Sequence, residues 1–293
     1  MSGFIEETAI SLLTMLPVFL LPALGEMLGE KSGVYNIGID GVMAFGALSG
    51  VAGYMLMYQS HLAAMMFGFA GGIAFGLFNS LLSIRFKLNQ IIVGFGIWFF
   101  ATGLAGLVYT STAVKDVVAE RFTPIFFSFD AVFYLSIVIF IGFYVLFAYT
   151  KQGTIIRAVG MNPRAADAAG INVDRVRWTC ATLGAGLVGF GGAYFAINFF
   201  QGFTQVAVAG YGWIAFAIVI FGRWRPSNVL LGSLLFATIT GLQTRGQVIG
   251  IAVPSEFMNV LPHISVIIAL TLIMVLGGRQ SAPESLGNPY VRE

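Results

Sequence analysis

Of the 293 residues in this chain, 58% are hydrophobic and only 10% are charged, a composition that excludes an ordinary soluble domain. The net charge of +2 indicates no partner by itself, and the single cysteine excludes an intrachain disulfide. Because the apolar runs show no strand-like alternation, helices rather than a β-barrel would satisfy the backbone in lipid. The sequence therefore predicts an all-α, polytopic membrane protein with a single transmembrane domain over residues 1–293.

Apolar runs of about 20 residues are long enough to cross a bilayer as helices. In chain order they predict nine transmembrane helices, at residues 8–24, 39–58, 61–84, 90–110, 131–149, 177–200, 206–222, 227–245 and 258–277. The boundary between the first two helices, residues 25–41, is the least defined.

Within this boundary, Gly25–Ser32 reads GEMLGEKS and resembles a phosphate-binding loop. That motif requires glycine directly before the lysine, whereas Glu30 stands there, and the spacing is short. We therefore expect no nucleotide site in this segment. Any ATP that drives the protein must then be bound by another chain.

Residues 36–41 read NIGIDG and place an ionisable side chain at the start of an apolar run. An ionisable residue in such a position is costly and often functional, which makes Asp40 a candidate for a translocation pathway. Glycines at 33, 38 and 41 would permit an irregular backbone that lines a cavity. The alternative is that Asp40 is an N-terminal helix charge at the membrane interface and that Asn36 is a cap.

Few polar side chains lie within or near the other runs. Amide groups and aromatic rings suit a neutral polar solute such as a sugar or a nucleoside, because a charged solute would need a buried counter-charge. The residues that we expect to line the substrate pathway are Asn36, Asp40, Asn79, Asn89, Gln90, Trp98 and Asn198.

The chain carries no HExxH, GxSxG or CxxC motif and only two histidines. We therefore expect no enzymatic activity, no metal site and no cofactor. Residues 41–46 and 214–222 share a rhythm of small and aromatic residues, and the predicted helices carry them in opposite directions across the membrane. This pattern fits an inverted repeat, which is common in transporters, but chance similarity explains it equally well.

The basic residues are distributed unevenly between the two sides of the membrane that nine helices define. Twelve of the 15 fall on the side of the C-terminus, and the other three are Lys115, Arg121 and Arg245. Because positively charged loops remain in the cytoplasm, the C-terminus is predicted to be cytoplasmic and the N-terminus external.

The largest loop on the cytoplasmic side, residues 151–176, contains the sequence GMNPRAADAAG. Asn162 can cap a helix, Pro163 suits its first position, and Gly170 can end it. A helix of about two turns is marginal alone in water, so its presence in a loop indicates that another element docks on it.

Four stretches, in order along the chain, resemble conserved blocks of bacterial-type ABC importer permeases for nucleosides and simple sugars. They are residues 25–47, which include GVYNIGIDG, 89–94 (NQIIVG), 153–173 (GTIIRAVGMNPRAADAAGINV) and 210–226 (GYGWIAFAIVIFGRWRP). The wider family also includes permeases for ribose and branched-chain amino acids. The first two stretches favour nucleosides, because ribose permeases typically continue differently after Gly-Ile-Asp.

The resemblance implies a multi-pass protein of the bacterial plasma (inner) membrane that forms a translocation path for a nucleoside, driven by ATP hydrolysis on a separate subunit. Its expected partners are cytoplasmic ATP-binding subunits, a second permease chain (the same or paralogous), an extracellular or periplasmic solute-binding protein and membrane lipids, with no nucleic acid. A short coupling helix would dock on the ATPase through Arg157, Asn162, Pro163, Arg164, Ala165, Ala166, Asp167 and Gly170. The alternatives are a simple-sugar (ribose-like) permease and an ion-coupled secondary transporter.

Overall fold

The computed structural model describes residues 10, 12–204, 210–249, 260–268, 271 and 282–291. Apart from one isolated bridge between Phe126 and Phe129, the regular structure in these residues is helical, which confirms the all-α prediction. The principal helices are α2 (Leu16–Lys31), α3 (Ile39–Leu56), α4 (His61–Ser80), α5 (Gln90–Ser111), α6 (Ala131–Tyr149), α7 (Lys151–Met161), α8 (Pro163–Ala168), α9 (Val173–Phe195), α10 (Tyr211–Phe221) and α11 (Pro226–Ile249).

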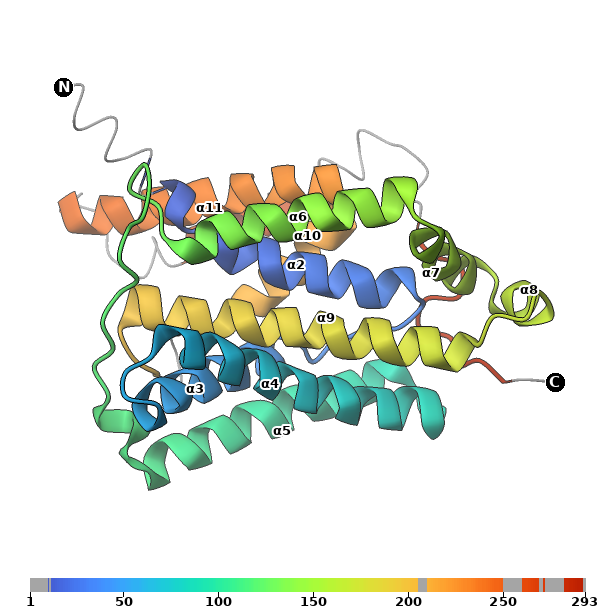
Figure 1. The fold of residues 1–293 in the computed structure, drawn as a ribbon, viewed down its shortest axis with the longest axis horizontal. Coiled ribbons are helices and arrows are strands. Elements are labelled where there is room, and N and C mark those ends of the chain that lie inside the picture. Colours follow the sequence, from blue (N-terminus) through green and yellow to red (C-terminus); the bar gives the residue numbers. More distant parts are fainter. Residues whose placement is uncertain are drawn as a thin grey trace.

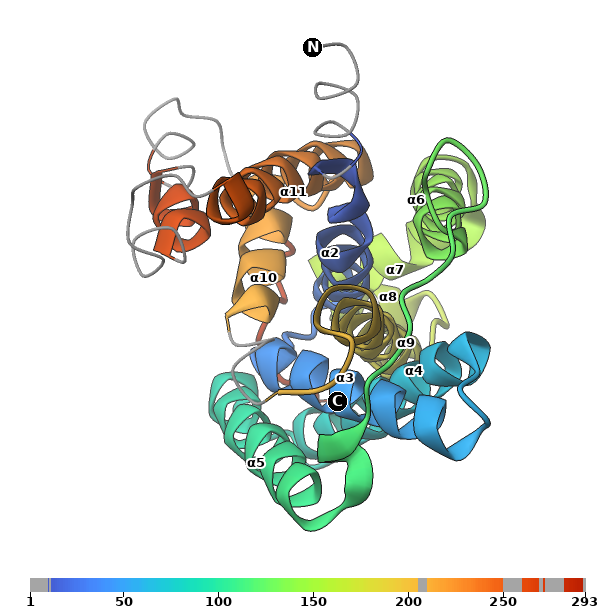
Figure 2. The same ribbon diagram turned by 90° about the vertical axis from the view of Figure 1, so that its left-hand side faces the viewer.

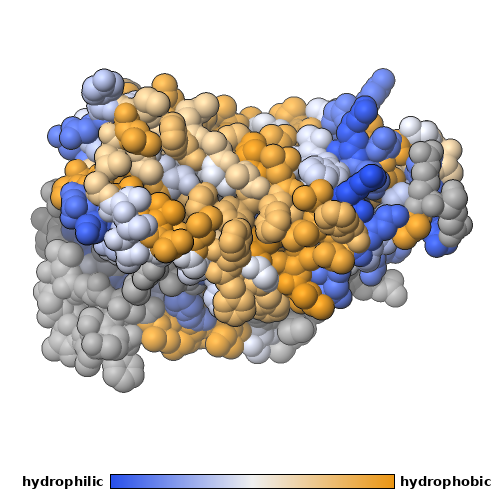
Figure 3. Space-filling view, turned by 90° about the horizontal axis from the view of Figure 1, so that it is seen from below, coloured by the Kyte–Doolittle hydropathy of each residue, from blue (hydrophilic) through white to orange (hydrophobic). Residues whose placement is uncertain are grey.

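The long helices lie side by side with α9 near the centre, flanked by α2, α3 and α4 (Figures 1 and 2). Among the described residues, six helical stretches are long and apolar enough to cross a membrane: Leu12–Lys31, Ile39–Leu56, His61–Arg85, Gln90–Ser111, Ala131–Tyr149 and Val173–Phe200. The face seen in Figure 3 carries a broad hydrophobic band between two hydrophilic ends. This surface is the one expected of a polytopic membrane protein.

Glycines allow α9 to approach its neighbours closely. A methyl group on Gly72 of α4 would collide with the carbonyl oxygen of Ala185 in α9, and Gly25 of α2 meets Gly184 of α9 in the same way. Small residues at such crossings let two helix backbones touch, which is the usual packing solution in membranes.

The first predicted helix boundary is wrong. The sequence suggested that this helix ends at residue 24, but α2 continues to Lys31 because Glu26 and Glu30 turn inward and find partners. The Glu26 carboxylate accepts the backbone N–H of Asn36 at 3.0 Å, and the Trp224 indole N–H donates to Glu30. Buried carboxylates with such donors can remain inside a membrane helix.

The later part of the chain differs from the predicted pattern of full crossings. In place of a helix over 206–222, α10 has 11 residues, about 16 Å of helix, which is too short to cross a bilayer alone. The 24-residue helix α11 covers the predicted run 227–245 but is not among the six candidate spans. Most of the predicted run 258–277 lies outside the described residues, so the count of nine remains a prediction.

Candidate functional site

The chain re-enters the helix bundle directly after α2. Residues 32–38, here called the re-entrant segment, run without regular secondary structure from the end of α2 to the start of α3, and Gly33 takes a φ of +96°. The backbone N–H of Tyr35 donates to Gln90 Oε1 at 2.8 Å, and Gln90 Nε2 donates to the Gly33 carbonyl at 3.4 Å. Asn79 Nδ2 donates to the Tyr35 carbonyl at 3.2 Å. The two amide side chains thus replace the hydrogen bonds that an irregular backbone lacks.

Asp40 joins the starts of two helices. It lies in the first turn of α3 and is only 5% exposed. One carboxylate oxygen, Oδ1, accepts the backbone N–H groups of Gly210 at 2.9 Å and Gly212 at 3.0 Å, at the start of α10. The other, Oδ2, accepts the Trp98 indole N–H at 3.3 Å. The negative charge therefore lies at the positive ends of both α3 and α10.

This junction lies well inside the bundle. Gly41, next to Asp40, packs on the backbone of Trp98, which is eight residues into α5 and hence about 12 Å from the start of that helix. An ionised group and two free helix ends are tolerated at such depth only where protein or a water-filled cavity surrounds them.

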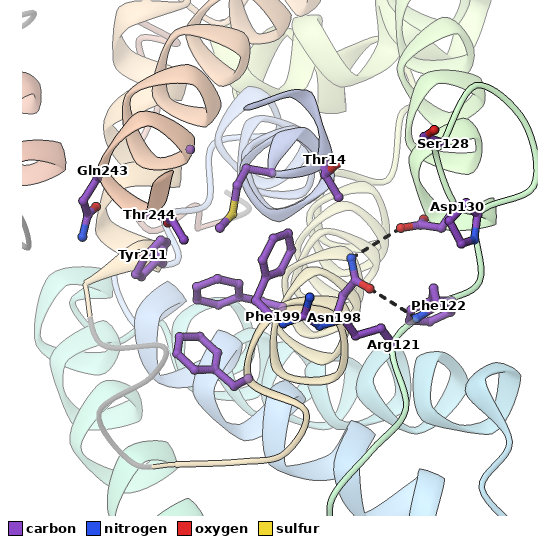
Figure 4. A pocket seen from close by; sticks show the side chains of 15 residues that line it. Thr14, Arg121, Phe122, Ser128, Asp130, Asn198, Phe199, Tyr211, Gln243 and Thr244 are labelled. Carbon is purple, nitrogen blue, oxygen red and sulfur yellow. Dashed lines mark hydrogen bonds between the residues drawn. The ribbon is translucent and has the colours of Figure 1, made fainter. Parts of the chain in front are cut away.

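A cavity of about 540 Å³, drawn in Figure 4, opens at the end of the molecule opposite α7 and α8, which Figure 1 labels. We call it the Asn198 cavity; it lies between the starts of α2 and α6, the end of α9, the start of α10 and the far end of α11. Its lining residues are Thr14, Met15, Arg121, Phe122, Pro124, Ser128, Asp130, Phe195, Asn198, Phe199, Phe200, Tyr211, Gly241, Gln243 and Thr244.

The walls of the Asn198 cavity combine aromatic rings with polar groups. The rings of Phe195 and Tyr211 are 4.5 Å apart, and Phe199 lies 5.7 Å from Phe195. Tyr211, Gln243 and Thr244 lie across the cavity from Asn198 and Asp130 (Figure 4). This mixture of flat apolar surface and hydrogen-bonding groups is typical of sites for small polar organic ligands.

Hydrogen bonds hold the polar wall of the cavity in place. Asn198 Nδ2 donates to the Tyr194 hydroxyl at 3.0 Å and to Asp130 Oδ2 at 3.4 Å, and its Oδ1 accepts the N–H of Phe122 at 3.3 Å. Tyr194 donates to Asp130 Oδ2 at 2.7 Å, while Asp130 Oδ1 caps α6. A ligand would therefore meet preorganised groups.

At the other end, the predicted short helix is confirmed as α8. Asn162 Oδ1 accepts the N–H of Ala165 at 3.0 Å, Pro163 is the first helical residue, and Gly170 follows with a φ of +82°. Ala166 is 4% exposed and packs with Val159 and Val173. The preceding helix, α7, was not predicted from the sequence. Both α7 and α8 project from the bundle (Figure 1) and have exposed residues.

The C-terminal segment, residues 282–291, connects α8 to the re-entrant segment. Tyr290 donates to Asp167 of α8 at 2.9 Å, and Ser285 Oγ donates to the Gly160 carbonyl at 2.7 Å. Arg177, only 2% exposed, donates to the Ser32 carbonyl at 3.2 Å, to Ser285 Oγ at 3.0 Å and to the Asn288 carbonyl at 3.1 Å. One buried guanidinium thus links three parts of the chain.

The predicted pathway residues separate into three places. Asn36, Asp40, Asn79, Gln90 and Trp98 gather around the re-entrant segment and the junction. Asn89 is exposed, and its side chain caps α5 by accepting the N–H groups of Ile91 and Ile92. Asn198 is the one predicted pathway residue that lines the cavity at the opposite end.

Sequence reasoning missed several residues of these networks. Asp130 and Tyr194 are engaged in the cavity wall, and Glu26 and Glu30 are buried in α2. The spacing of the two glutamates, four residues apart in an apolar run, was a usable signal of an inward-facing polar pair.

Comparison with known proteins identifies the family. The model of a family described as the permease component of the branched-chain amino acid transport system matches residues 8–278. The guanosine ABC transporter permease NupQ of Bacillus subtilis is 32% identical, covering 93% of this chain and 92% of that protein. The nucleoside ABC transporter permease NupC of Lactococcus lactis is 30% identical, covering 93% of each chain.

The fold also resembles a solved structure. An ABC transporter of the metal-chelate type in an inward-facing conformation superposes with a TM-score of 0.55 at 15% identity, covering 90% of this chain and 85% of that one. At this identity the likeness concerns the fold alone. Taken with the family match over residues 8–278, the helical architecture leads to one conclusion: the chain belongs to the family of branched-chain amino acid transport system permease components and is a multi-pass ABC transporter permease, not an enzyme.

Proposed function

We propose that this chain is the permease subunit of an ABC importer for nucleosides, with its C-terminus in the cytoplasm. The observation that carries the proposal is the Asn198 cavity, whose volume of about 540 Å³ falls in the range of small-molecule sites. Nucleobases stack on aromatic side chains, and ribose hydroxyls pair with amides and carboxylates. The relatives NupQ and NupC are named for guanosine and nucleosides, which supports the same solute class.

The α7–α8 end is the proposed docking surface for the ATP-binding subunit. The exposed positions of α8 are Arg164, Ala165 and Ala168, and Arg157 is exposed on α7. ATP-driven movement of α8 would pass through Tyr290 and the C-terminal segment to Arg177, and from there to the re-entrant segment. The connection ends at the junction of α3 and α10, which could open and close a path through the bundle.

A second permease chain is proposed to cover the side of the junction formed by α5 and α10. Trp98 and Trp213 meet edge-to-face at 5.7 Å on this side, and Phe95, 42% exposed, lies against both. Tryptophan prefers the membrane–water boundary to the apolar interior. Two indoles beside a buried carboxylate at this depth therefore favour a protein or water neighbour over lipid chains.

The opposed directions of α3 and α10 support the proposed inverted repeat. The two helices begin at the same carboxylate, that of Asp40, which accepts the N–H groups of Gly210 and Gly212 at the start of α10. Broken helices whose N-termini meet near the middle of the membrane are a recurring feature of transporters built from inverted repeats.

The test is uptake by proteoliposomes that contain the permease, its ATP-binding subunits and the solute-binding protein. We expect guanosine accumulation to require ATP and to be competed by other nucleosides but not by ribose or glucose. Competition by the sugars alone would favour the simple-sugar alternative. Accumulation by the permease alone, driven by an ion gradient, would contradict the ABC mechanism.

A matched pair of variants tests the coupling helix. Ala166→Pro removes the N–H that donates to the Asn162 carbonyl at 3.0 Å and breaks α8, so it should abolish uptake while the protein still inserts. Ala169→Gly, at the exposed C-cap of the same helix, should leave uptake unchanged because it keeps the N–H that donates to the Ala165 carbonyl at 3.1 Å and removes only one exposed methyl group. Normal uptake by the proline variant would overturn the docking assignment.

A further inference from the structure

A second cavity, of about 300 Å³, lies at the α7–α8 end where α2, α7 and the turn between α10 and α11 meet. Four of the residues that line it are basic, and they come from three separate segments. The lining residues are Lys31, Arg157, Met161, Arg223, Trp224, Arg225 and Pro283. No carboxylate is among the described residues that line this cavity, which we call the basic pocket.

The backbone and the buried side chains fix the shape of the basic pocket. Arg223 and Trp224 adopt φ values of +51° and +56°, which hold the α10–α11 turn in a left-handed conformation uncommon for such residues. Trp224 is 5% exposed and donates its indole N–H to Glu30, which is completely buried behind it. Glu30 therefore pairs with the indole on the inner side and does not line the pocket.

The backbone brings these cations to one place. The Lys31 ammonium lies 4.6 Å above the centre of the Phe147 ring, at the end of α6. The turn positions Arg223 and Arg225, and α7 carries Arg157. Like charges gathered at one place, here those of Lys31, Arg157 and Arg225, repel one another, and a bound anion would reduce that repulsion.

The location of the basic pocket indicates which kind of anion would bind there. Lys31 ends the membrane span Leu12–Lys31, and Phe147 lies two residues before the end of the span Ala131–Tyr149. The pocket therefore opens at the level of the lipid headgroups, beside a membrane-spanning helix. Guanidinium groups match phosphate oxygens in geometry and charge, and basic pockets at this level recognise anionic headgroups.

We propose that the basic pocket binds the phosphodiester headgroup of an anionic phospholipid from the leaflet at the α7–α8 end. This assigns the GRWRP sequence, Gly222–Pro226, a binding role that is independent of the transported solute. The bound lipid would hold the α10–α11 turn against α7, next to the surface proposed to dock the ATPase. The proposal does not depend on the solute being a nucleoside.

The test is native mass spectrometry of the full-length permease taken from vesicles of phosphatidylcholine with about one fifth phosphatidylglycerol. The wild type should retain phosphatidylglycerol, whereas Arg225→Gln combined with Lys31→Gln should retain it at least about tenfold less. Arg85→Gln combined with Lys87→Gln, which removes two exposed cations at and just after the end of the span His61–Arg85, is the charge-matched control and should retain it like the wild type.

Single substitutions at Arg225 and competition with inorganic phosphate complete the test. Arg225 is exposed on a turn, so Arg225→Gln alone should fold normally and still lose lipid, while Arg225→Lys should keep part of it. Displacement of the lipid by millimolar inorganic phosphate would show that a free phosphate is the occupant and would overturn the lipid assignment. Equal lipid retention in all variants, with loss of ATPase association in the Arg225 variants, would place a carboxylate of the partner in the pocket instead.

Discussion

The two polar regions of the molecule use the same chemistry for different purposes. Around the re-entrant segment, amides and a carboxylate pair with backbone groups, and Asn79, Gln90 and Asp40 are each at most 5% exposed. At the opposite end, Asn198 and Asp130 also form internal hydrogen bonds, but they border a cavity of about 540 Å³. Both regions therefore contain hydrogen-bonding side chains. Only the region around Asn198 has a cavity beside them, among the described residues of the two regions, and so has room for a solute.

This difference assigns the two regions separate tasks. The inner region supports backbone that departs from helix inside the membrane, where water cannot satisfy it. The outer region supplies a preformed surface of rings and amides. Variants in the inner region should accordingly lower stability, and variants in the cavity should lower the affinity for the solute.

The largest effect is expected at Asp40. Asp40→Leu leaves the N–H groups of Gly210, Gly212 and Trp98 without their acceptor, which should cost about 3 kcal/mol or more. Asp40→Asn keeps one acceptor oxygen for the two glycines but turns a donor toward the Trp98 indole, so the loss should be about 1 kcal/mol. Thermal unfolding in detergent measures both. Equal stability of the two variants would contradict the junction as described.

A smaller loss is expected at Gln90. Gln90→Ala leaves the Tyr35 N–H unpaired and removes one of the two donors to the Gly33 carbonyl, at a cost of about 2 kcal/mol in stability. The neighbouring Asn89→Ala is the control, because it removes only an exposed helix cap worth about 1 kcal/mol. If the Gln90 variant were as stable as wild type but had a raised KM, Gln90 would belong to the solute path instead.

In the Asn198 cavity, a substitution should change the affinity for the solute and leave the stability of the protein nearly unchanged. Phe199 is half-buried in the wall, and Phe199→Ala removes a stacking surface, which should raise the KM for nucleoside uptake about tenfold. The expression level and the unfolding temperature should change little. An unchanged KM for the variant would argue against contact between this ring and the solute.

The smallest effect is expected at the hydrogen bond that joins the C-terminal segment to α8. Tyr290→Phe removes one hydrogen bond to Asp167, which should cost about 1 kcal/mol and loosen the C-terminal segment. We expect nucleoside uptake to fall by about twofold while ATP hydrolysis by the complex stays at its wild-type rate. Parallel loss of both rates would indicate weaker ATPase docking rather than weaker transmission.

Much of this architecture was predictable, because hydrophobic runs and local caps act over short stretches of sequence. The boundaries of α5 and α6 and the capped helix α8 follow from such local rules. The sequence also nominated Asp40, but the acceptor role for α10 depends on Gly210 and Gly212, which are 170 residues or more away. No local pattern contains that information.

The remaining errors have a common physical cause. The predicted helix 8–24 stopped short of Glu26, whereas partners from distant segments allow Glu26 and Glu30 to stay in α2. The same applies to the amides, because Asn79 and Gln90 were candidates for solute contact. The irregular backbone of residues 32–38 instead pairs with both the oxygen and the nitrogen of the Gln90 amide and with the nitrogen of the Asn79 amide. The solute role of the predicted pathway residues stays a prediction.

Photolabelling shows directly whether the solute binds in the Asn198 cavity. A photoreactive azidoguanosine would be bound to the complete importer with its ATPase subunits, irradiated, and the modified peptides mapped by mass spectrometry. We predict that the label falls on residues of the Asn198 cavity, foremost Phe199 and Tyr211, and that unlabelled nucleoside prevents it. Protectable labelling confined to other surfaces of the permease, with none in the cavity, would show that the solute binds elsewhere.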